Sequence, residues 1–150
     1  MMLKRNGMPA RQGGFTLIEI MVVVVILGVL AAIVVPNIMS RPDQAKVTVA
    51  NADVKAVASA LEMYRLDNGF YPSTDQGLDA LVHEPSGSPE PRNWNPDGYL
   101  KKIPQDPWGN PYQYEQPGTR NTNSYDLYSL GADGRVGGEG FNADIGNWDD

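Results

Sequence analysis

The sequence feature that most constrains the fold is a long, predominantly apolar segment near the N-terminus, FTLIEIMVVVVILGVLAAIVV, which covers residues 15–35. As an α-helix it would be about 31 Å long, close to the thickness of the hydrocarbon core of a bilayer. Lys4, Arg5 and Arg11 all precede it. Because basic residues favour the cytoplasmic side, we expect the chain after Val35 to be exported. The segment therefore predicts a single membrane-spanning helix.

The start of this segment differs from an ordinary secretory signal peptide. Such a peptide has an apolar core of about 7–15 residues followed by a cleavage site with small residues. Here the small pair, Gly13 and Gly14, comes before the apolar core. Cleavage between Gly14 and Phe15 would remove residues 1–14 as a leader. The mature protein would then keep its membrane helix and carry a free α-amine on Phe15.

Glu19 lies five residues into the predicted membrane helix. A carboxylate at the centre of such a helix costs about 2.5–3.5 kcal/mol on insertion scales, so it usually has a partner. The Phe15 amine of a neighbouring subunit is a candidate partner. This pairing would place helices side by side with an offset of about one helical turn, as a buried polar contact sets register. We therefore predict that Glu19 acts in assembly.

Residues 36–68 are expected to continue as an amphipathic helix. Pro36 and Pro42 mark either the exit from the membrane or a weak point in the helix. From Lys46 the apolar positions follow a spacing of three and four residues and form one seam, made of Val47, Ala50, Val54, Val57, Leu61 and Tyr64. This seam should pack against a C-terminal sheet. Gly69 is expected to end the helix as a left-handed cap.

Residues 69–150 predict a loop-rich globular domain, because most of the glycines and prolines lie there. Residues 74–82 favour a short helix with Ser73 or Thr74 as its cap. Alternating patterns predict strands at 112–115 and 125–130, with a third short strand around 145–148. The expected fold class is α+β: a long N-terminal helix, first transmembrane and then amphipathic, packed on a small antiparallel sheet.

Charge and residue usage exclude several classes of function. The net charge is −6, and it becomes −9 without the three basic residues of the leader. An acidic chain without a basic stripe gains nothing from releasing the counterions of nucleic acid, so we expect no such partner. The chain has no cysteine, and its single histidine, His83, has no partner pattern and is expected at the surface. A membrane-anchored enzyme is disfavoured because no nucleophile–base pair is evident.

An acidic, glycine-rich stretch runs from Leu130 to Asp144 and holds five glycines. Calcium prefers six to eight oxygen ligands drawn from carboxylates and backbone carbonyls, and glycines let the backbone curl so that carbonyls converge. The spacing of an EF-hand is absent. Composition alone leaves two interpretations open, a calcium loop and a flexible polar turn between two strands.

The leader junction Gly14-Phe15-Thr16-Leu17-Ile18-Glu19 resembles the prepilin peptidase motif of type IV pilins and pseudopilins. This resemblance implies a pilin-like fold, and it implies that a prepilin peptidase cleaves after Gly14. It further implies that Phe15 becomes N-methylated and that Glu19 aids assembly.

The rest of the chain resembles the major pseudopilins of type II secretion systems, through Gln76-Gly77-Leu78, Asp106-Pro107-Trp108-Gly109, Ser129-Leu130-Gly131-Ala132-Asp133-Gly134 and Asp144-Ile145-Gly146-Asn147-Trp148. The resemblance implies one calcium ion in the C-terminal loop. The implied ligands are the side chains of Asp133 and Asp144, the backbone oxygens of Leu130 and Arg135, and Asn142. The loop is longer than in many members and has Ala143-Asp144 where they have two aspartates. Glu139 or a nearby carbonyl is therefore a further candidate.

The resemblance also implies a structural role rather than catalysis. Such a subunit sits in the bacterial inner membrane with its C-terminal domain in the periplasm, and it polymerises with itself into a helical pseudopilus that drives export of folded proteins. The implied partners are minor pseudopilins, the prepilin peptidase and an inner-membrane assembly platform. A type IV pilus major pilin is the alternative. Many such pilins brace their C-terminal region with a disulfide, which a chain without cysteine cannot form.

Overall fold

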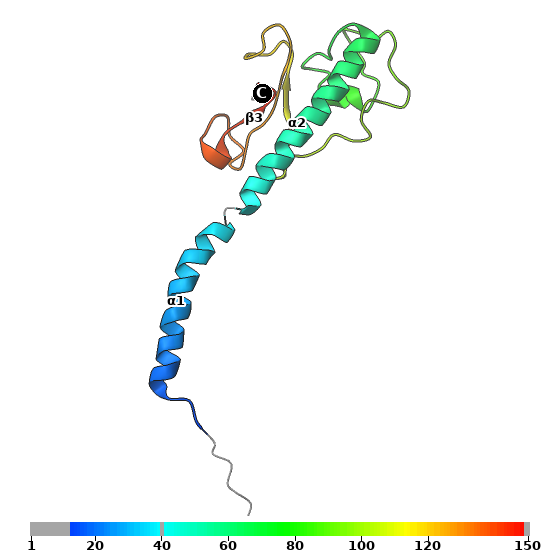
Figure 1. Cartoon of the computed structure of the whole chain (residues 1–150). Coiled ribbons are helices and arrows are strands. Elements are labelled where there is room, and N and C mark those ends of the chain that lie inside the picture. Colours follow the sequence, from blue (N-terminus) through cyan, green and yellow to red (C-terminus); the bar gives the residue numbers. More distant parts are fainter. Residues whose placement is uncertain (1–12, 40, 149–150) are drawn as a thin grey trace, which may run out of the picture. The chain divides into compact units, whose positions relative to one another are not determined.

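The computed structural model describes residues 13–39 and 41–148, although the side chains of residues 34–39 and 41 are outside that description. The chain divides into two compact units, residues 1–40 and 41–150. The first contains one helix, α1 (Leu17–Met39). The second contains helix α2 (Arg41–Asn68), two short 3₁₀ helices and a three-stranded sheet (Figure 1).

Helix α1 follows an exposed segment without regular secondary structure, residues 13–16. The side chains of residues 17–33 are all exposed in the isolated chain, although most of them are apolar. Pro36 lies inside α1 rather than at its end. Within the described part of the chain, no helix meets the combined length and apolarity needed to cross a membrane.

Helix α2 buries the seam that the sequence predicts. Ala50, Val54, Val57, Leu61 and Tyr64 are all buried, and Ala60 joins them. The helix ends at Asn68, and Gly69 follows with φ 86° while its N–H donates to the carbonyl of Arg65 at 2.7 Å. The left-handed glycine cap is therefore confirmed, and the chain turns back over the buried face of α2.

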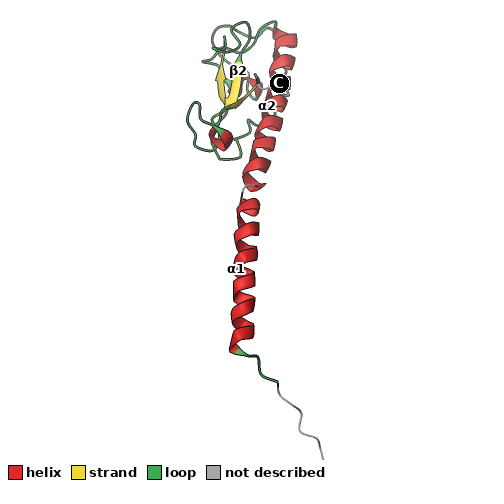
Figure 2. Ribbon diagram, turned by 60° about the vertical axis from the view of Figure 1, so that its left-hand side comes forward, coloured by secondary structure: helices red, strands yellow, loops and turns green. Residues whose placement is uncertain are grey.

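The sheet is antiparallel with the order β1-β2-β3, formed by β1 (Gln113–Glu115), β2 (Asp126–Ser129) and β3 (Ile145–Gly146). Tyr114 pairs with Leu127 in β1–β2, and Ser129 pairs with Ile145 in β2–β3. Leu127 is fully buried and belongs to the same core cluster as the α2 seam. Figure 2 shows the strands and most of the loops on one side of α2. All three predicted strands are confirmed, although each is shorter than expected.

The predicted helix over residues 74–82 is wrong in extent. Only Leu78–Leu81 is helical, as the 3₁₀ helix η1. The predicted cap is wrong as well, because the N-cap of η1 is Gly77, without a side-chain hydrogen bond. Ser73 instead bonds reciprocally with Gln76: its Oγ accepts from the N–H of Gln76 at 3.2 Å, and the Gln76 side chain accepts from the Ser73 N–H at 3.0 Å. These bonds close a turn. Gly77, with φ 61°, then changes the direction of the chain, so the turn does not continue as one helix into η1.

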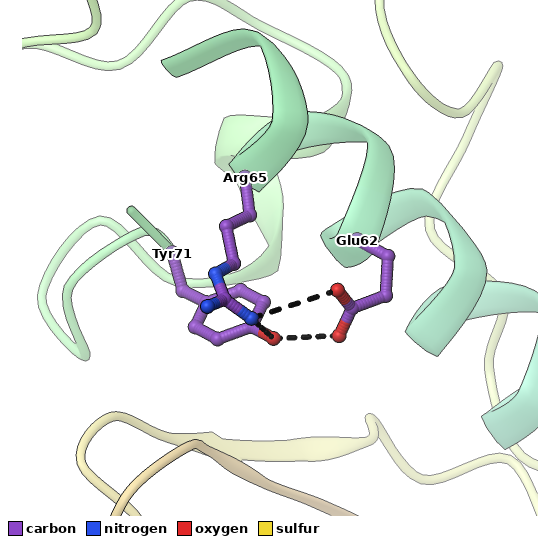
Figure 3. A network of polar contacts seen from close by, with 3 residues as sticks. All are labelled: Glu62, Arg65 and Tyr71. Carbon is purple, nitrogen blue, oxygen red and sulfur yellow. Dashed lines mark hydrogen bonds and ion pairs between the residues drawn. The ribbon is translucent and has the colours of Figure 1, made fainter. Parts of the chain in front are cut away.

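The segment that follows α2 is fixed to the helix by polar and aromatic contacts. The Tyr71 hydroxyl donates to Glu62 Oε1 at 2.6 Å and accepts from Arg65 Nη1 at 3.1 Å (Figure 3). The hydrogen bond from Arg65 to Tyr71 raises the pKa of the guanidinium. Because Tyr71 also packs edge-on against Tyr125, this network links the surface of α2 to the residue that precedes β2.

Two core tyrosines differ in how their hydroxyl groups are satisfied. Tyr64 is fully buried, and its hydroxyl has no hydrogen-bond partner among the described residues. Burial raises the pKa of Tyr64 to about 12. Tyr112 is also buried, but its hydroxyl donates to Asp53 Oδ2 on α2 at 2.9 Å. An unpaired buried hydroxyl costs free energy, whereas a paired one contributes.

We therefore expect Tyr64→Phe to leave the stability unchanged or to raise it by up to about 1 kcal/mol, since it removes an unsatisfied polar group. Tyr112→Phe is the matched control and should lower the stability by about 1–2 kcal/mol, because Asp53 loses its donor. Thermal unfolding of the detergent-solubilised chain, followed by circular dichroism, measures both changes. A larger loss for Tyr64→Phe than for Tyr112→Phe would contradict this assignment.

Candidate functional site

The predicted cleavage site lies in a segment without regular secondary structure, just before α1. Gly14 and Phe15 are exposed and belong to no helix. Helix α1 then begins with reciprocal hydrogen bonds: the Glu19 N–H donates to Thr16 Oγ1 at 3.3 Å, and the Thr16 N–H donates to Glu19 Oε2 at 3.4 Å. This is the geometry of a capping box, which satisfies two backbone donors at a helix start.

Thr16 is a residue that the sequence analysis did not single out. The signal was present, because a threonine followed three residues later by a glutamate before an apolar run is typical of a helix start. The capping box also places the Glu19 carboxylate at the N-terminus of α1, where the helix dipole favours a negative charge. The carboxylate therefore has a partner in its own chain before any neighbour is present. Its pairing with the Phe15 amine of another subunit stays a prediction.

The glycine-rich loop, residues 131–144, connects β2 to β3 and folds back on itself. The Ala132 N–H donates to the carbonyl of Phe141 at 2.9 Å, and Phe141 lies in the 3₁₀ helix η2 (Gly140–Asn142). Gly138 has φ 96°, and a Cβ there would collide with the Asn142 carbonyl. The backbones of Gly138 and Asn142 therefore approach each other more closely than a side chain at position 138 would permit.

Asp144 lies where the loop rejoins the sheet. Its Oδ2 accepts from the Gly137 N–H at 2.9 Å, which ties the loop to its own C-terminal end. Its Oδ1 is buried and has no hydrogen-bond partner among the described residues. A buried carboxylate oxygen without a donor is costly, and an adjacent cation removes that cost. This orphaned oxygen fits a loop that holds a metal ion.

The other predicted ligands are less enclosed. Asp133 is exposed, and its Oδ1 accepts from the Arg135 N–H at 3.0 Å. Arg135 and Asn142 are exposed as well, while Leu130 is half-buried. Within the described ranges no group of three or more acidic or histidine side chains is placed to hold a metal ion. The predicted set has only two carboxylates and otherwise relies on Asn142 and backbone oxygens, so calcium stays a prediction.

A buried aspartate outside the loop holds the loop's first residues in place. Asp106 Oδ1 accepts from the N–H groups of Trp108 at 3.1 Å and Asn110 at 2.8 Å, and Oδ2 accepts from Ser129 Oγ at 2.6 Å. Ser129 Oγ in turn accepts from the Gly131 N–H at 3.1 Å. The sequence analysis missed this role of Asp106 and Ser129. An aspartate that opens a Pro-Trp-Gly turn was the available signal.

His83 lies at the surface, as predicted. It is exposed, and its Nδ1 is 3.0 Å from Asp79 Oδ1. Asp79 also lines an open hollow together with Asp75, Glu84 and three serines, Ser73, Ser86 and Ser88. His83 is not part of that lining, and its contact with Asp79 joins residues four apart in the sequence.

The comparisons with known proteins identify the family. The family described as "Type II secretion system (T2SS), protein G" matches residues 37–148, and the "Prokaryotic N-terminal methylation motif" matches residues 9–35. The chain belongs to the type II secretion system protein G family. The second match places the predicted leader junction within a recognised motif, and together the two support the pseudopilin interpretation over a type IV pilin.

Relatives and a solved structure agree with this assignment. The chain is 71% identical over 139 residues to the type II secretion system core protein G of Pseudomonas aeruginosa, covering 93% of this chain and 96% of the relative. It is 56% identical to the protein of that name from Vibrio cholerae, covering 92% of each. The crystal structure of the major pseudopilin from enterohaemorrhagic Escherichia coli matches with a TM-score of 0.66 and 49% identity, covering 77% of this chain and 96% of that one. The α+β, pilin-like fold is therefore confirmed.

The closure of the loop predicts a difference between two neighbouring glycines. Gly137 and Gly138 both have positive φ, at 88° and 96°, but a Cβ on Gly137 meets no atom within 4 Å. Gly138→Ala should therefore cost more stability than Gly137→Ala, because it adds a collision to the same backbone strain. Thermal unfolding measures the difference. Equal losses in the two variants would show that the loop is not closed as described.

Proposed function

We propose that this chain is the major subunit of a periplasmic pseudopilus and is held in the bacterial inner membrane by residues 15–35 before assembly. The observation that carries the proposal is the family match over residues 37–148. The exposed apolar surface of α1 supports it. Between Phe15 and Ile33 nearly every large side chain is apolar and uncovered, and such a surface needs lipid or protein against it.

In the proposed mechanism, a prepilin peptidase cuts the exposed bond between Gly14 and Phe15. The new Phe15 amine is methylated, and Glu19 of one subunit pairs with that amine on its neighbour. The α1 helices then pack together in the filament core, and the second unit lies outside. Subunits added at the inner-membrane platform, with minor pseudopilins among them, lengthen the filament and move folded proteins toward the outer membrane.

The proposal includes a structural calcium ion in the loop of residues 131–144. The orphaned Asp144 Oδ1 supports it. Asp133, Asn142 and the backbone oxygens of Leu130 and Arg135 would complete the site. A bound cation would join the two ends of the loop, which hydrogen bonds from Ala132 and Gly137 already bring together. Bracing of this kind is useful to a chain without cysteine, because no disulfide can do it.

Calcium is expected to stabilise the second unit through Asp144. The fragment 41–150 suits this test, since it has its own core and the solved E. coli relative covers a similar share of the chain. At a calcium concentration 100-fold above its Kd, the stability should rise by about 2.7 kcal/mol. Calorimetry with calcium and then with a chelator measures the rise.

Asp144→Asn should abolish this rise, because its neutral amide is a poorer cation ligand. Asp97→Asn is the matched control, since Asp97 is an exposed aspartate outside the loop, and it should retain the rise. If the wild-type fragment is equally stable with calcium and with the chelator, the metal site is removed from the proposal. The filament assignment would still stand, since it rests on the family match.

The capping box allows the charge of Glu19 to be tested apart from its hydrogen bonding. Glutamine also completes a capping box, but it cannot form an ion pair with an amine. Glu19→Gln should therefore keep the start of α1 and permit leader removal, yet abolish filament assembly. Mass spectrometry of the full chain reports cleavage, and secretion of an exported protein in complemented cells reports assembly.

Thr16→Ser is the matched control for this experiment, because serine retains both the cap and Glu19. It should behave as the wild type in cleavage and in secretion. Full secretion by Glu19→Gln would rule out the ion pair with the Phe15 amine.

A further inference from the structure

Helix α2 carries a second apolar pattern on the side that its own domain leaves uncovered. We call it the outer strip, and its residues are spaced three and four apart: Val49, Ala52, Ala56, Ser59, Met63 and Leu66. All six are exposed, and Val49, Met63 and Leu66 have exposed fractions of 50%, 53% and 83%. At 100° per residue this strip lies well around the helix from the buried seam. The outer strip contains no charged residue, whereas Lys55 and Glu62, at neighbouring exposed positions, are charged.

The side chains of the outer strip are smallest in its middle. The three central positions, Ala52, Ala56 and Ser59, have the smallest side chains, and the larger Val49 and Met63 lie on either side along the helix. The side chains in the middle of the strip therefore extend less far from the helix axis than those at its ends. A single protruding apolar side chain fits such a surface better than a flat partner does, because small residues permit close approach.

One such side chain exists elsewhere in the same unit. Within residues 42–148, the large apolar side chains with high exposure are the three on the outer strip and Val136, which is 77% exposed. Val136 lies in the 131–144 loop, and the hydrogen bonds at Arg135 and Gly137 fix the backbone on both sides of it. The loop thus presents an isolated valine to solvent from a held backbone.

A filament places a specific requirement on these surfaces. A patch that pairs with itself closes a dimer, whereas an open polymer needs two different patches that fit one another. The outer strip and Val136 are two such patches on one chain, one with small side chains at its centre and one a single exposed valine. We infer that Val136 of one subunit packs into the outer strip of α2 on a second copy of this chain. The inference rests on the proposed filament.

This contact connects the metal-binding loop to assembly. The loop would be ordered by the cation and would then offer Val136 in one position, so loss of the cation would weaken subunit contacts without any change at α1. Burying the strip costs little, because no charge has to be desolvated there. The contact would lie outside the filament core and would add to the packing of the α1 helices.

Cysteine cross-linking tests the contact, because the chain has no cysteine of its own. Cells that secrete through this system would co-express the full-length Val136→Cys chain with a chain carrying Val49→Cys, Ala52→Cys, Ala56→Cys or Ser59→Cys. A disulfide needs Cα atoms within about 7 Å, and the periplasm is oxidising. At least one pair should give a dimer on a non-reducing gel. Asn51→Cys, next to Ala52 in the sequence but at least about 80° around the helix from each of the four positions, should not.

Substitution of the valine gives a second readout. In a chain without introduced cysteines, Val136→Ser should reduce filament assembly by several-fold, measured as secretion of an exported protein. It should leave the calcium-dependent rise in melting temperature unchanged, because the side chain points to solvent. Thr122→Val, at an exposed position in another loop, is the control and should secrete normally.

The outcomes separate the inference from the proposed function. Full secretion with no dimer from any strip position, or full secretion by Val136→Ser, would overturn the contact and leave the filament in place. Failure of the unmodified chain to restore secretion in cells lacking it would count against the proposed function and, with it, the contact.

Discussion

Burial of one face of α2 is the interaction on which the second unit depends. The sheet has only short strands, and small sheets are not stable without a surface to pack against. The α2 seam supplies that surface, with Leu61 and Tyr64 fully buried and Leu127 of β2 in the same cluster. The loops are held by contacts with this core. Tyr71 bonds to α2, Tyr99 packs on Tyr64, Trp94 packs on Tyr99, and Asp106 accepts a hydrogen bond from Ser129 at the end of β2.

The glycine loop takes its shape from this scaffold. Its two ends leave β2 and β3, which are neighbours in the sheet, so the intervening residues must return to within one strand spacing of their start. Gly131 and Gly138 allow the backbone to pass close to Asn142 on the way. The result leaves one buried Asp144 oxygen without a donor and one valine facing solvent. The first supports a cation inside the loop, and the second supports a partner outside it.

The two units have opposite relations to their surroundings. The second unit covers its own apolar seam, whereas α1 leaves nearly all of its large apolar side chains exposed. Glu19 fits this contrast, because in the isolated chain its carboxylate bonds to Thr16 at the start of the same helix. A subunit of this kind keeps its polar group satisfied before assembly. It still has an apolar helix whose cover must come from lipid or from other copies.

Most elements of the fold could be predicted from local patterns in the sequence. The three-and-four spacing of residues 47–64 predicted which face of α2 is buried, Gly69 predicted where the helix ends, and alternation predicted the first two strands, because these features depend on neighbours in the sequence. The leader junction was predicted for the same reason, and it lies within the residues that match the N-terminal methylation motif, although the cleavage position itself stays a prediction. The cap formed by Thr16 was equally local and could have been found.

Other features needed the tertiary structure. The turn at Ser73–Gln76 replaced an expected helix because Gly77 redirects the chain toward the core, and helical periodicity does not report that change of direction. The chain Asp106–Ser129–Gly131 joins segments more than twenty residues apart, so no local pattern reveals it. The sequence by itself determined that the loop is acidic and flexible enough for a cation. Which oxygen is buried without a donor, and which side chain faces out, was decided only when β2 and β3 paired and fixed the two ends of the loop.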